Sequence, residues 1–86
     1  MGAKRRPQPS RLGRKLLQLR KGLALSQEQM AERLTSKKSP VYPTHVSEFE
    51  RSKREPSLLV LLRYAQIVKV STDILIDDDL DLPNKL

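Results

Sequence analysis

The stretch "SQEQMAERL" (residues 26–34) and the segment after it, "TSKKSPVYPTHVSEFERSKREP" (residues 35–56), decide how this chain folds. The first stretch carries helix-start signals, because Ser26 is a favoured N-cap residue and Gln29 completes a capping box. A helix this short is not stable alone in water. It must therefore pack against neighbours, and its inward face would hold apolar residues at helical spacing: Met30, Ala31 and Leu34.

Similar signals predict four more helices around this segment. Ser10 can cap a first helix, which carries apolar residues spaced four, three and four apart (Leu12, Leu16, Leu19 and Leu23), with Gly22 allowing a turn near its end. Pro43 suits the first position of a third helix, where its missing N–H costs nothing. That helix would turn Val46 and Phe49 inward. Ser57 and Ser71 can cap a fourth and a fifth helix.

These signals predict a compact all-α domain of five short helices over residues 10–77. A basic arm (residues 1–9) precedes it, and an acidic tail (residues 78–86) follows it. In the fourth and fifth helices we expect core positions at Leu58, Leu61, Leu62, Ala65, Val68, Val70, Ile74 and Leu75. Further apolar residues exceed what one core stripe needs: Leu59, Val60, Tyr64 and Ile67. This excess predicts an apolar face for a partner, most simply a second copy of the chain.

Composition narrows the functional classes. The chain has no cysteine and one histidine, so it offers little material for a metal site or for acid–base catalysis. We therefore expect no enzyme activity, no metal and no cofactor. No apolar stretch approaches the roughly 18 residues of a membrane span, and the N-terminus does not read as a signal peptide. A cytoplasmic location without membrane attachment fits these features.

Charge is unevenly distributed along the chain. Residues 1–24 hold eight basic and no acidic residues, whereas residues 73–86 hold five aspartates and one lysine. The net charge is +7, so the part before this acidic end carries +11 against its −4. A basic body indicates a polyanionic partner, most often nucleic acid, although a solvated surface without a partner remains the alternative.

Two short helices in the middle, the second polar on its outer side, are typical of a helix-turn-helix. The segments "LGRKLLQLRKGLALSQEQMAERL" and "VSEFERSKREPSLLVLLRYAQIVKVSTDILI" together resemble the helix-turn-helix domain of the bacterial and phage repressor, Cro and Xre family. The resemblance covers about residues 11–76 and implies a lambda repressor-like fold. It differs at an expanded turn, "TSKKSPVYP", expected to protrude, and at Thr35, Ser52 and Lys69, where the family often has glycine.

The resemblance implies a third helix that enters the major groove of DNA. The positions aligned with base-contacting residues are Pro43, Thr44, Ser47 and Glu48. Thr44 and Ser47 can hydrogen-bond to base edges, and Glu48 can accept a hydrogen bond from cytosine. Backbone contacts are expected from Gln27 at the start of the second helix, from Lys37 and Lys38 in the turn, from His45, and from Arg51, Lys53 and Arg54. Lys4, Arg5 and Arg6 form either a DNA-binding arm or a basic terminus without a role.

Glu50 has a different expected role. A bare carboxylate there would repel phosphates, and the resemblance implies that it forms a structural ion pair with Arg20. Such a pair would join the first and third helices and neutralise the carboxylate.

The sequence therefore predicts a transcriptional regulator that binds double-stranded DNA at an operator, with a homodimer as an open option. The competing interpretation is an antitoxin or adaptor that uses the same scaffold to bind a protein. The apolar excess of the fourth helix and the leucines of the acidic tail favour that alternative. The tail could bind a protein partner, cover the apolar face, lie against the basic body or remain a disordered end.

Overall fold

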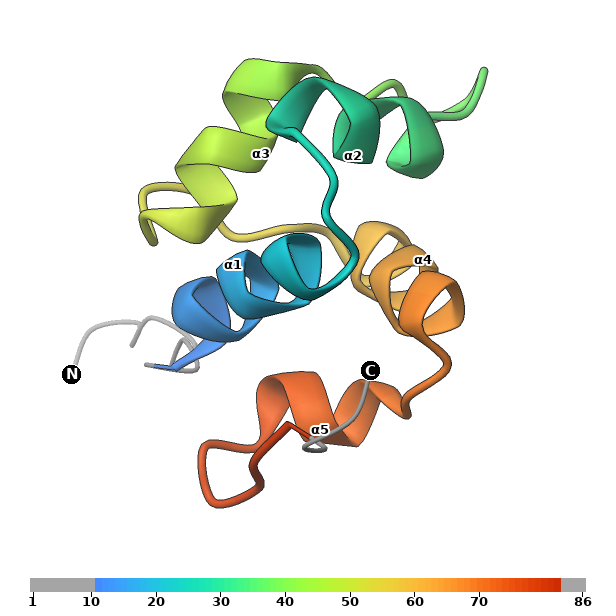
Figure 1. Cartoon of the computed structure of the whole chain (residues 1–86). Coiled ribbons are helices and arrows are strands. Elements are labelled where there is room, and N and C mark those ends of the chain that lie inside the picture. The colour runs from blue at the N-terminus through green and yellow to red at the C-terminus, as the bar shows by residue number, and fades with distance from the viewer. Residues whose placement is uncertain (1–10, 83–86) are drawn as a thin grey trace, which may run out of the picture.

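A computed structural model describes residues 11–82 and contains five α-helices in that range. They are α1 (Leu12–Gly22), α2 (Gln27–Leu34), α3 (Pro43–Glu50), α4 (Leu58–Val68) and α5 (Thr72–Ile76). In Figure 1, α1 lies in the middle, with α2 and α3 above it, α4 to one side and α5 below. The all-α, five-helix expectation is confirmed. The expectations for residues 1–10, including Ser10 and the arm with Lys4, Arg5 and Arg6, lie outside the described residues.

Side-chain caps define where α2 and α4 begin. The Oγ of Ser26 accepts a bond from Gln29 N at 3.0 Å, and the Oε1 of Gln29 accepts one from Ser26 N at 2.8 Å. Ser57 Oγ accepts a bond from Val60 N at 3.2 Å. Ser71 occupies the N-cap of α5 but makes no side-chain capping bond. Arg11 stands at the N-cap of α1 and makes no side-chain capping bond.

In the described residues, the positions of positive φ that follow the helices are occupied by residues other than glycine. Gly22, expected to allow the turn, is the last residue of α1, and the positive φ of 58° falls instead on Ala24. Ser52 and Lys69, two positions where the resemblance led us to expect glycine, each have a φ of 59°, whereas Thr35 is extended. A non-glycine residue in this region costs roughly 1–2 kcal/mol. The missing glycines therefore reduce stability at Ser52 and Lys69 but not at Thr35.

One apolar core joins all five helices. Its fully buried members include Leu16 and Leu19 of α1, Met30 and Leu34 of α2, and Val46 of α3, all 0% exposed. α4 and α5 add Val60, Leu61, Tyr64, Ala65 and Leu75. The inward faces expected for α2 and α3 are confirmed. Burial of Tyr64 raises the pKa of its hydroxyl, because the charged form loses its hydration.

The rotation expected for α4 was wrong. Leu58 and Leu62, assigned to the core, are 75% and 44% exposed, whereas Val60 and Tyr64, counted as excess, are buried. Nine of the eleven residues of α4 are apolar, so only Arg63 and Gln66 mark a solvent side in its sequence. Packing against α2 and α5 decides which side is buried. An exposed apolar surface does remain on α4, formed by Leu58, Leu59 and Leu62.

Gly13 allows α1 and the end of α3 to approach closely. A Cβ atom there would lie 2.9 Å from the carbonyl oxygens of Phe49 and Glu50, and 2.6 Å from Ser52 Oγ. A side chain at this position would force the backbone of α3 away from α1. The absence of a side chain at Gly13 thus permits the short distance between the backbones of α1 and the end of α3.

Candidate nucleic-acid interface

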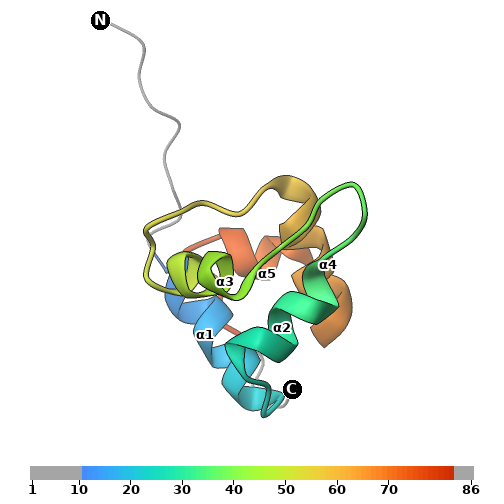
Figure 2. The same cartoon turned by 90° about the horizontal axis from the view of Figure 1, so that it is seen from above.

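The outer side of α3 is a polar surface on a helix held from beneath. Val46 and Phe49 are 0% and 5% exposed and anchor the helix in the core. Thr44 is exposed, and Ser47 and Glu48 are half-buried. Figure 2 shows α3 between two connecting segments, the 35–42 turn and the loop after residue 50. A short helix presented in this way has the shape that a DNA major groove accepts.

The start of α3 has a cap that sequence reasoning did not assign. Pro43 occupies the first turn, where its missing N–H breaks no bond. The Nδ1 atom of His45 accepts a hydrogen bond from Tyr42 N at 3.3 Å. The two rings meet edge to face, with centroids 5.4 Å apart. His45, expected to contact the DNA backbone, therefore also stabilises the helix start, and its three-residue spacing from Tyr42 was the available signal.

Glu50 lies at the centre of a buried polar network. Arg20 Nε donates to Glu50 Oε2 at 2.7 Å, and Arg20 Nη2 donates to Oε1 at 3.1 Å. The two side chains are 13% and 3% exposed. Arg20 also donates to the carbonyl oxygen of Leu25 at 2.9 Å. The hydrogen-bonded Glu50 carboxylate raises the pKa of Arg20, so the guanidinium stays charged.

Gln27 belongs to the same network. Its Nε2 atom donates to Glu50 Oε1 at 3.1 Å, which uses one of the two amide hydrogens expected for a phosphate. The network thus connects the end of α1, the start of α2 and the end of α3. It fixes the angle between α2 and α3, and it holds the Gln27 amide at the first turn of α2. The second amide hydrogen and the backbone N–H groups of that turn can still serve an anion.

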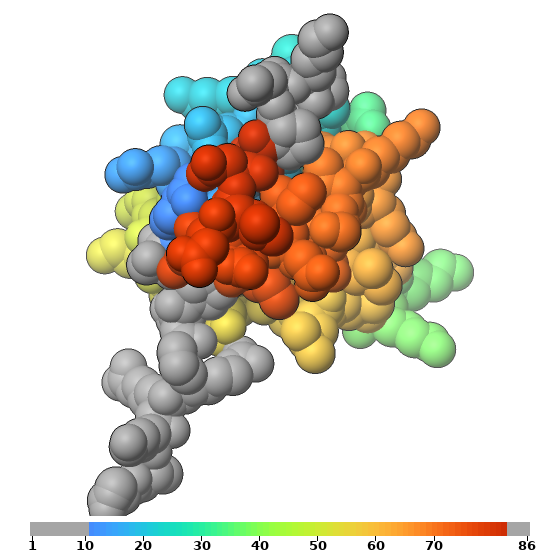
Figure 3. Space-filling view, turned by 90° about the horizontal axis from the view of Figure 1, so that it is seen from below, coloured from blue at the N-terminus to red at the C-terminus, as the bar shows by residue number. Residues whose placement is uncertain are grey.

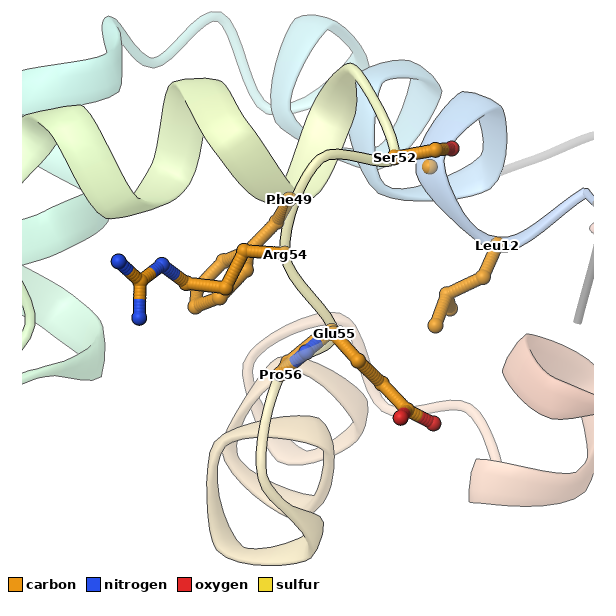
Figure 4. Close-up of a pocket in the computed structure, with 7 residues that line it drawn as sticks. Leu12, Phe49, Ser52, Arg54, Glu55 and Pro56 are labelled. Atoms are coloured by element: carbon orange, nitrogen blue, oxygen red, sulfur yellow. The ribbon is translucent and has the colours of Figure 1, made fainter. Parts of the chain in front are cut away.

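A second ion pair lies on the outer side of α3. Arg54 Nε donates to Glu48 Oε1 at 2.6 Å, and both residues are partly exposed. Figure 4 shows the Arg54 side chain extending away from the loop and lying beside Phe49. The guanidinium lowers the pKa of Glu48, because it bonds to the charged form. The pair offsets the repulsion that a bare Glu48 would exert on phosphates.

The remaining predicted basic residues stand on either side of α3. Arg51 and Lys53 are exposed in the loop that follows it, and Lys37 and Lys38 are exposed in the expanded turn. That turn is closed by two backbone bonds between Ser36 and Ser39, each 3.1 Å long. It protrudes from the body as expected (Figure 1), but its base is anchored by Val41, which is 6% exposed.

The crevice under the end of α3 is too small for a ligand, and the described residues offer no metal centre. The crevice in Figure 4, between Leu12, Phe49 and Pro56, holds about 10 Å³, which is room for roughly one water. Residues 11–82 contain no group of three histidine or acidic side chains suited to a metal ion. Within the same range, no helix is long and apolar enough to cross a bilayer.

The described part of the acidic tail lies against the start of α1. Arg11 N donates to Asp78 Oδ1 at 3.0 Å, and the Arg11 guanidinium pairs with Asp81. Lys15 is 1% exposed, and its Nζ donates to the carbonyl oxygens of Ile74 and Asp77 at 2.6 and 2.8 Å. Figure 3 shows the segment after α5 resting beside α1. Contact of the tail with the basic body was one of the alternatives open from the sequence, whereas the burial of Lys15 was not predicted, since nothing in the local sequence marks it.

Comparisons with known proteins agree with the architecture. The P22 c2 repressor, solved with a synthetic operator, is similar with a TM-score of 0.68 and 26% identity, over 79% of this chain and 96% of that one. A SinR protein/SinI protein complex contains a chain with a TM-score of 0.66 and 26% identity, covering 79% of this chain and 62% of that one. No curated protein sequence matches.

The sequence profile of the helix-turn-helix family matches residues 16–75, which is most of the chain. The matched region includes α2, α3 and the network around Glu50. The expected family and fold are therefore confirmed. This chain belongs to the helix-turn-helix family of the phage repressor, Cro and Xre type.

Proposed function

We propose that this protein binds double-stranded DNA at a specific operator, with α3 in the major groove, and so regulates transcription. The observation that supports it most is the exposed polar side of α3, bordered by basic residues and braced by α2. A structural neighbour, the P22 c2 repressor, was solved with a synthetic operator. We place the protein in the bacterial cytoplasm, on the nucleoid when bound.

Specificity would come from Thr44, Ser47 and Glu48. Thr44 offers a hydroxyl and a methyl group, so it can bond a base edge or contact the methyl of thymine. Ser47 lies one turn further along the same side of α3 and can donate or accept. Glu48 can accept from the amino group of cytosine when Arg54 keeps it ionised and oriented. Pro43, at the start of α3, would contact bases only through its apolar ring.

Affinity would come from phosphate contacts on both sides of α3. Arg51, Lys53 and Arg54 would bind one strand beyond the end of α3, and Gln27 would contact the backbone at the start of α2. Lys37, Lys38 and His45 are the candidates on the side of the expanded turn. Such contacts set register and salt dependence and carry little sequence information.

The test is selection of a random duplex library on the purified full chain near physiological salt, followed by sequencing. We expect one short enriched motif, and a palindromic repeat about 10 base pairs apart if two copies bind. The double variant Thr44→Ala, Ser47→Ala should lose discrimination between the motif and random DNA. Gln66→Ala, on an exposed position of α4, is the matched control and should keep it. Absence of any enriched motif would refute operator binding.

A protein-binding role is the second candidate, supported by the exposed leucines of α4. Leu58, Leu59 and Leu62 form an apolar surface on one helix, and the SinR neighbour was solved in a protein complex. In this alternative the protein is an antitoxin or adaptor and the basic surface is accessory. Sedimentation of the full chain and of Leu59→Ser, Leu62→Ser separates the cases. If the full chain self-associates and the variant does not, the surface is a homodimer contact. The exposed leucines then no longer support an adaptor role.

A further inference from the structure

An open hollow lies between α1 and the segment that follows α3. It has a volume of about 340 Å³ and is lined by Arg11, Arg14, Leu17, Glu50, Arg51 and Ser52. Three of these six residues are arginines. They come from two separate parts of the chain, which the packing of α3 over α1 brings together. Gly13 contributes to this juxtaposition, because its lack of a side chain lets the end of α3 approach α1.

The positive charge of the hollow is not balanced within it. The Glu50 side chain is 3% exposed and is already bonded to Arg20 and Gln27. Arg11 is held by Asp78 and Asp81 of the tail. Arg14 and Arg51 are exposed, and neither forms an ion pair with another residue of the described range. Two guanidinium groups therefore line this surface without an ion-pair partner in the described range, and only the Glu48 carboxylate acts on Arg51 from a longer distance.

Arg51 has most of its hydrogen-bonding capacity unused. Its Nε donates a long bond of 3.4 Å to the carbonyl oxygen of Ser47. Its terminal amino groups make no hydrogen bond to residues 11–82 that would occupy them. A guanidinium group binds phosphate oxygens through two parallel N–H bonds, and two such groups suit one tetrahedral anion. Ser52, an exposed residue that lines the same hollow, carries a hydroxyl that can add a further donor.

We infer that this hollow is a phosphate-binding site formed by Arg14 and Arg51, with Ser52 at its edge. The inference rests on the proposed function for the source of the phosphate, which we assign to the DNA backbone beyond the end of α3. Arg51 directly follows α3, so a strand that passes this helix end reaches the hollow next. The site would extend the DNA contact from the helix-turn-helix onto α1. Arg11 contributes less, because the tail already neutralises it.

The first measurement is the salt dependence of duplex binding by the full chain. For each phosphate contact that is lost, the slope of log K against log salt should fall by about 0.9. We expect this reduction, and several-fold weaker binding, for Arg14→Gln. Lys69→Gln removes one exposed positive charge at the end of α4, on the opposite side of the molecule from α3, and should leave the slope unchanged. An equal slope for both variants would overturn the DNA assignment. Circular dichroism shows whether each variant is folded.

The second measurement tests the site without DNA. Inorganic phosphate is titrated into the full chain, and the Nε–H signals of Arg14 and Arg51 are followed by NMR at constant ionic strength. Saturable shifts that Arg14→Gln abolishes and Lys69→Gln preserves support the phosphate site. Shifts of both arginine signals that rise linearly with phosphate and do not saturate would overturn it. If the wild type binds no duplex but shows saturable shifts, the proposed function fails while the anion site stands, with free phosphate as its source.

Discussion

Arg20 at the end of α1 and Glu50 at the end of α3 form a two-pronged ion pair, with bonds of 2.7 and 3.1 Å, in a nearly dry environment. Gln27 from α2 bonds to the same carboxylate. One carboxylate thus joins three helices that also share the apolar core. The orientation of α3 relative to α2, on which a groove-reading surface depends, is set at this point.

Arg20→Ala should lower the free energy of unfolding by about 3 kcal/mol, because it leaves the Glu50 carboxylate buried without its cation. Urea denaturation followed by circular dichroism measures the loss. The double variant Arg20→Met, Glu50→Leu is the control, and it should lose clearly less, since no buried charge remains. A loss for Arg20→Ala of the size typical for a surface pair, below about 1 kcal/mol, would contradict the network's role.

Gly13→Ala should destabilise the fold by about 1–3 kcal/mol, because the added Cβ would meet two carbonyl oxygens of α3 at 2.9 Å. This outcome opposes helix propensity, which favours alanine over glycine by roughly 1 kcal/mol. Gly22→Ala, at the exposed last residue of α1, is the matched control and should be neutral or slightly stabilising. Thermal unfolding of both variants measures the difference. If Gly13→Ala stabilised the fold as much as Gly22→Ala, α3 would not need this close approach.

Truncation of two leucines of α4 should change stability by very different amounts. Leu61 is 5% exposed and Leu58 is 75% exposed. Leu61→Ala should cost about 2–5 kcal/mol, since it removes buried methyl groups and leaves a cavity. Leu58→Ala should change stability by no more than about 0.5 kcal/mol. Chemical denaturation of the pair tests the rotation of α4, and a reversed order would support the sequence-based assignment of Leu58 to the core.

The contact between the tail and α1 should appear as a pH effect. The hydrogen-bonded guanidinium of Arg11 lowers the pKa of the Asp81 carboxyl below its usual range. Its contribution to stability is therefore present above the unfolded pKa of about 3.9 and is lost as pH falls through the lower folded value. Because both groups are exposed, salt should weaken the effect.

NMR titration of the Asp81 carboxyl checks this prediction. Arg11→Gln should return the pKa of Asp81 toward its usual range, whereas Lys69→Gln should leave it in place. An unchanged titration of Asp81 in Arg11→Gln would mean that the tail does not rest on α1 in solution.

The sequence alone determined where most helices begin and which family they form. Ser26 with Gln29, Pro43 and Ser57 are local signals, because a cap or a first-turn proline acts on the next three or four residues. The inward faces of α2 and α3 could also be predicted, since their apolar residues stand among polar ones. The Arg20–Glu50 pair followed from the resemblance, and the structure contains it.

Tertiary structure decided the features that depend on residues far apart in the chain. α4 is apolar on most sides, so only packing against α2 and α5 selects Val60 and Tyr64 for burial over Leu58 and Leu62. The Glu48–Arg54 pair needs the path of the loop after α3, and the burial of Lys15 needs the carbonyl groups at the end of α5. The hollow between Arg14 and Arg51 exists because α3 lies over α1. A charged side chain reveals its partner only once the chain has brought distant backbone segments within hydrogen-bond reach.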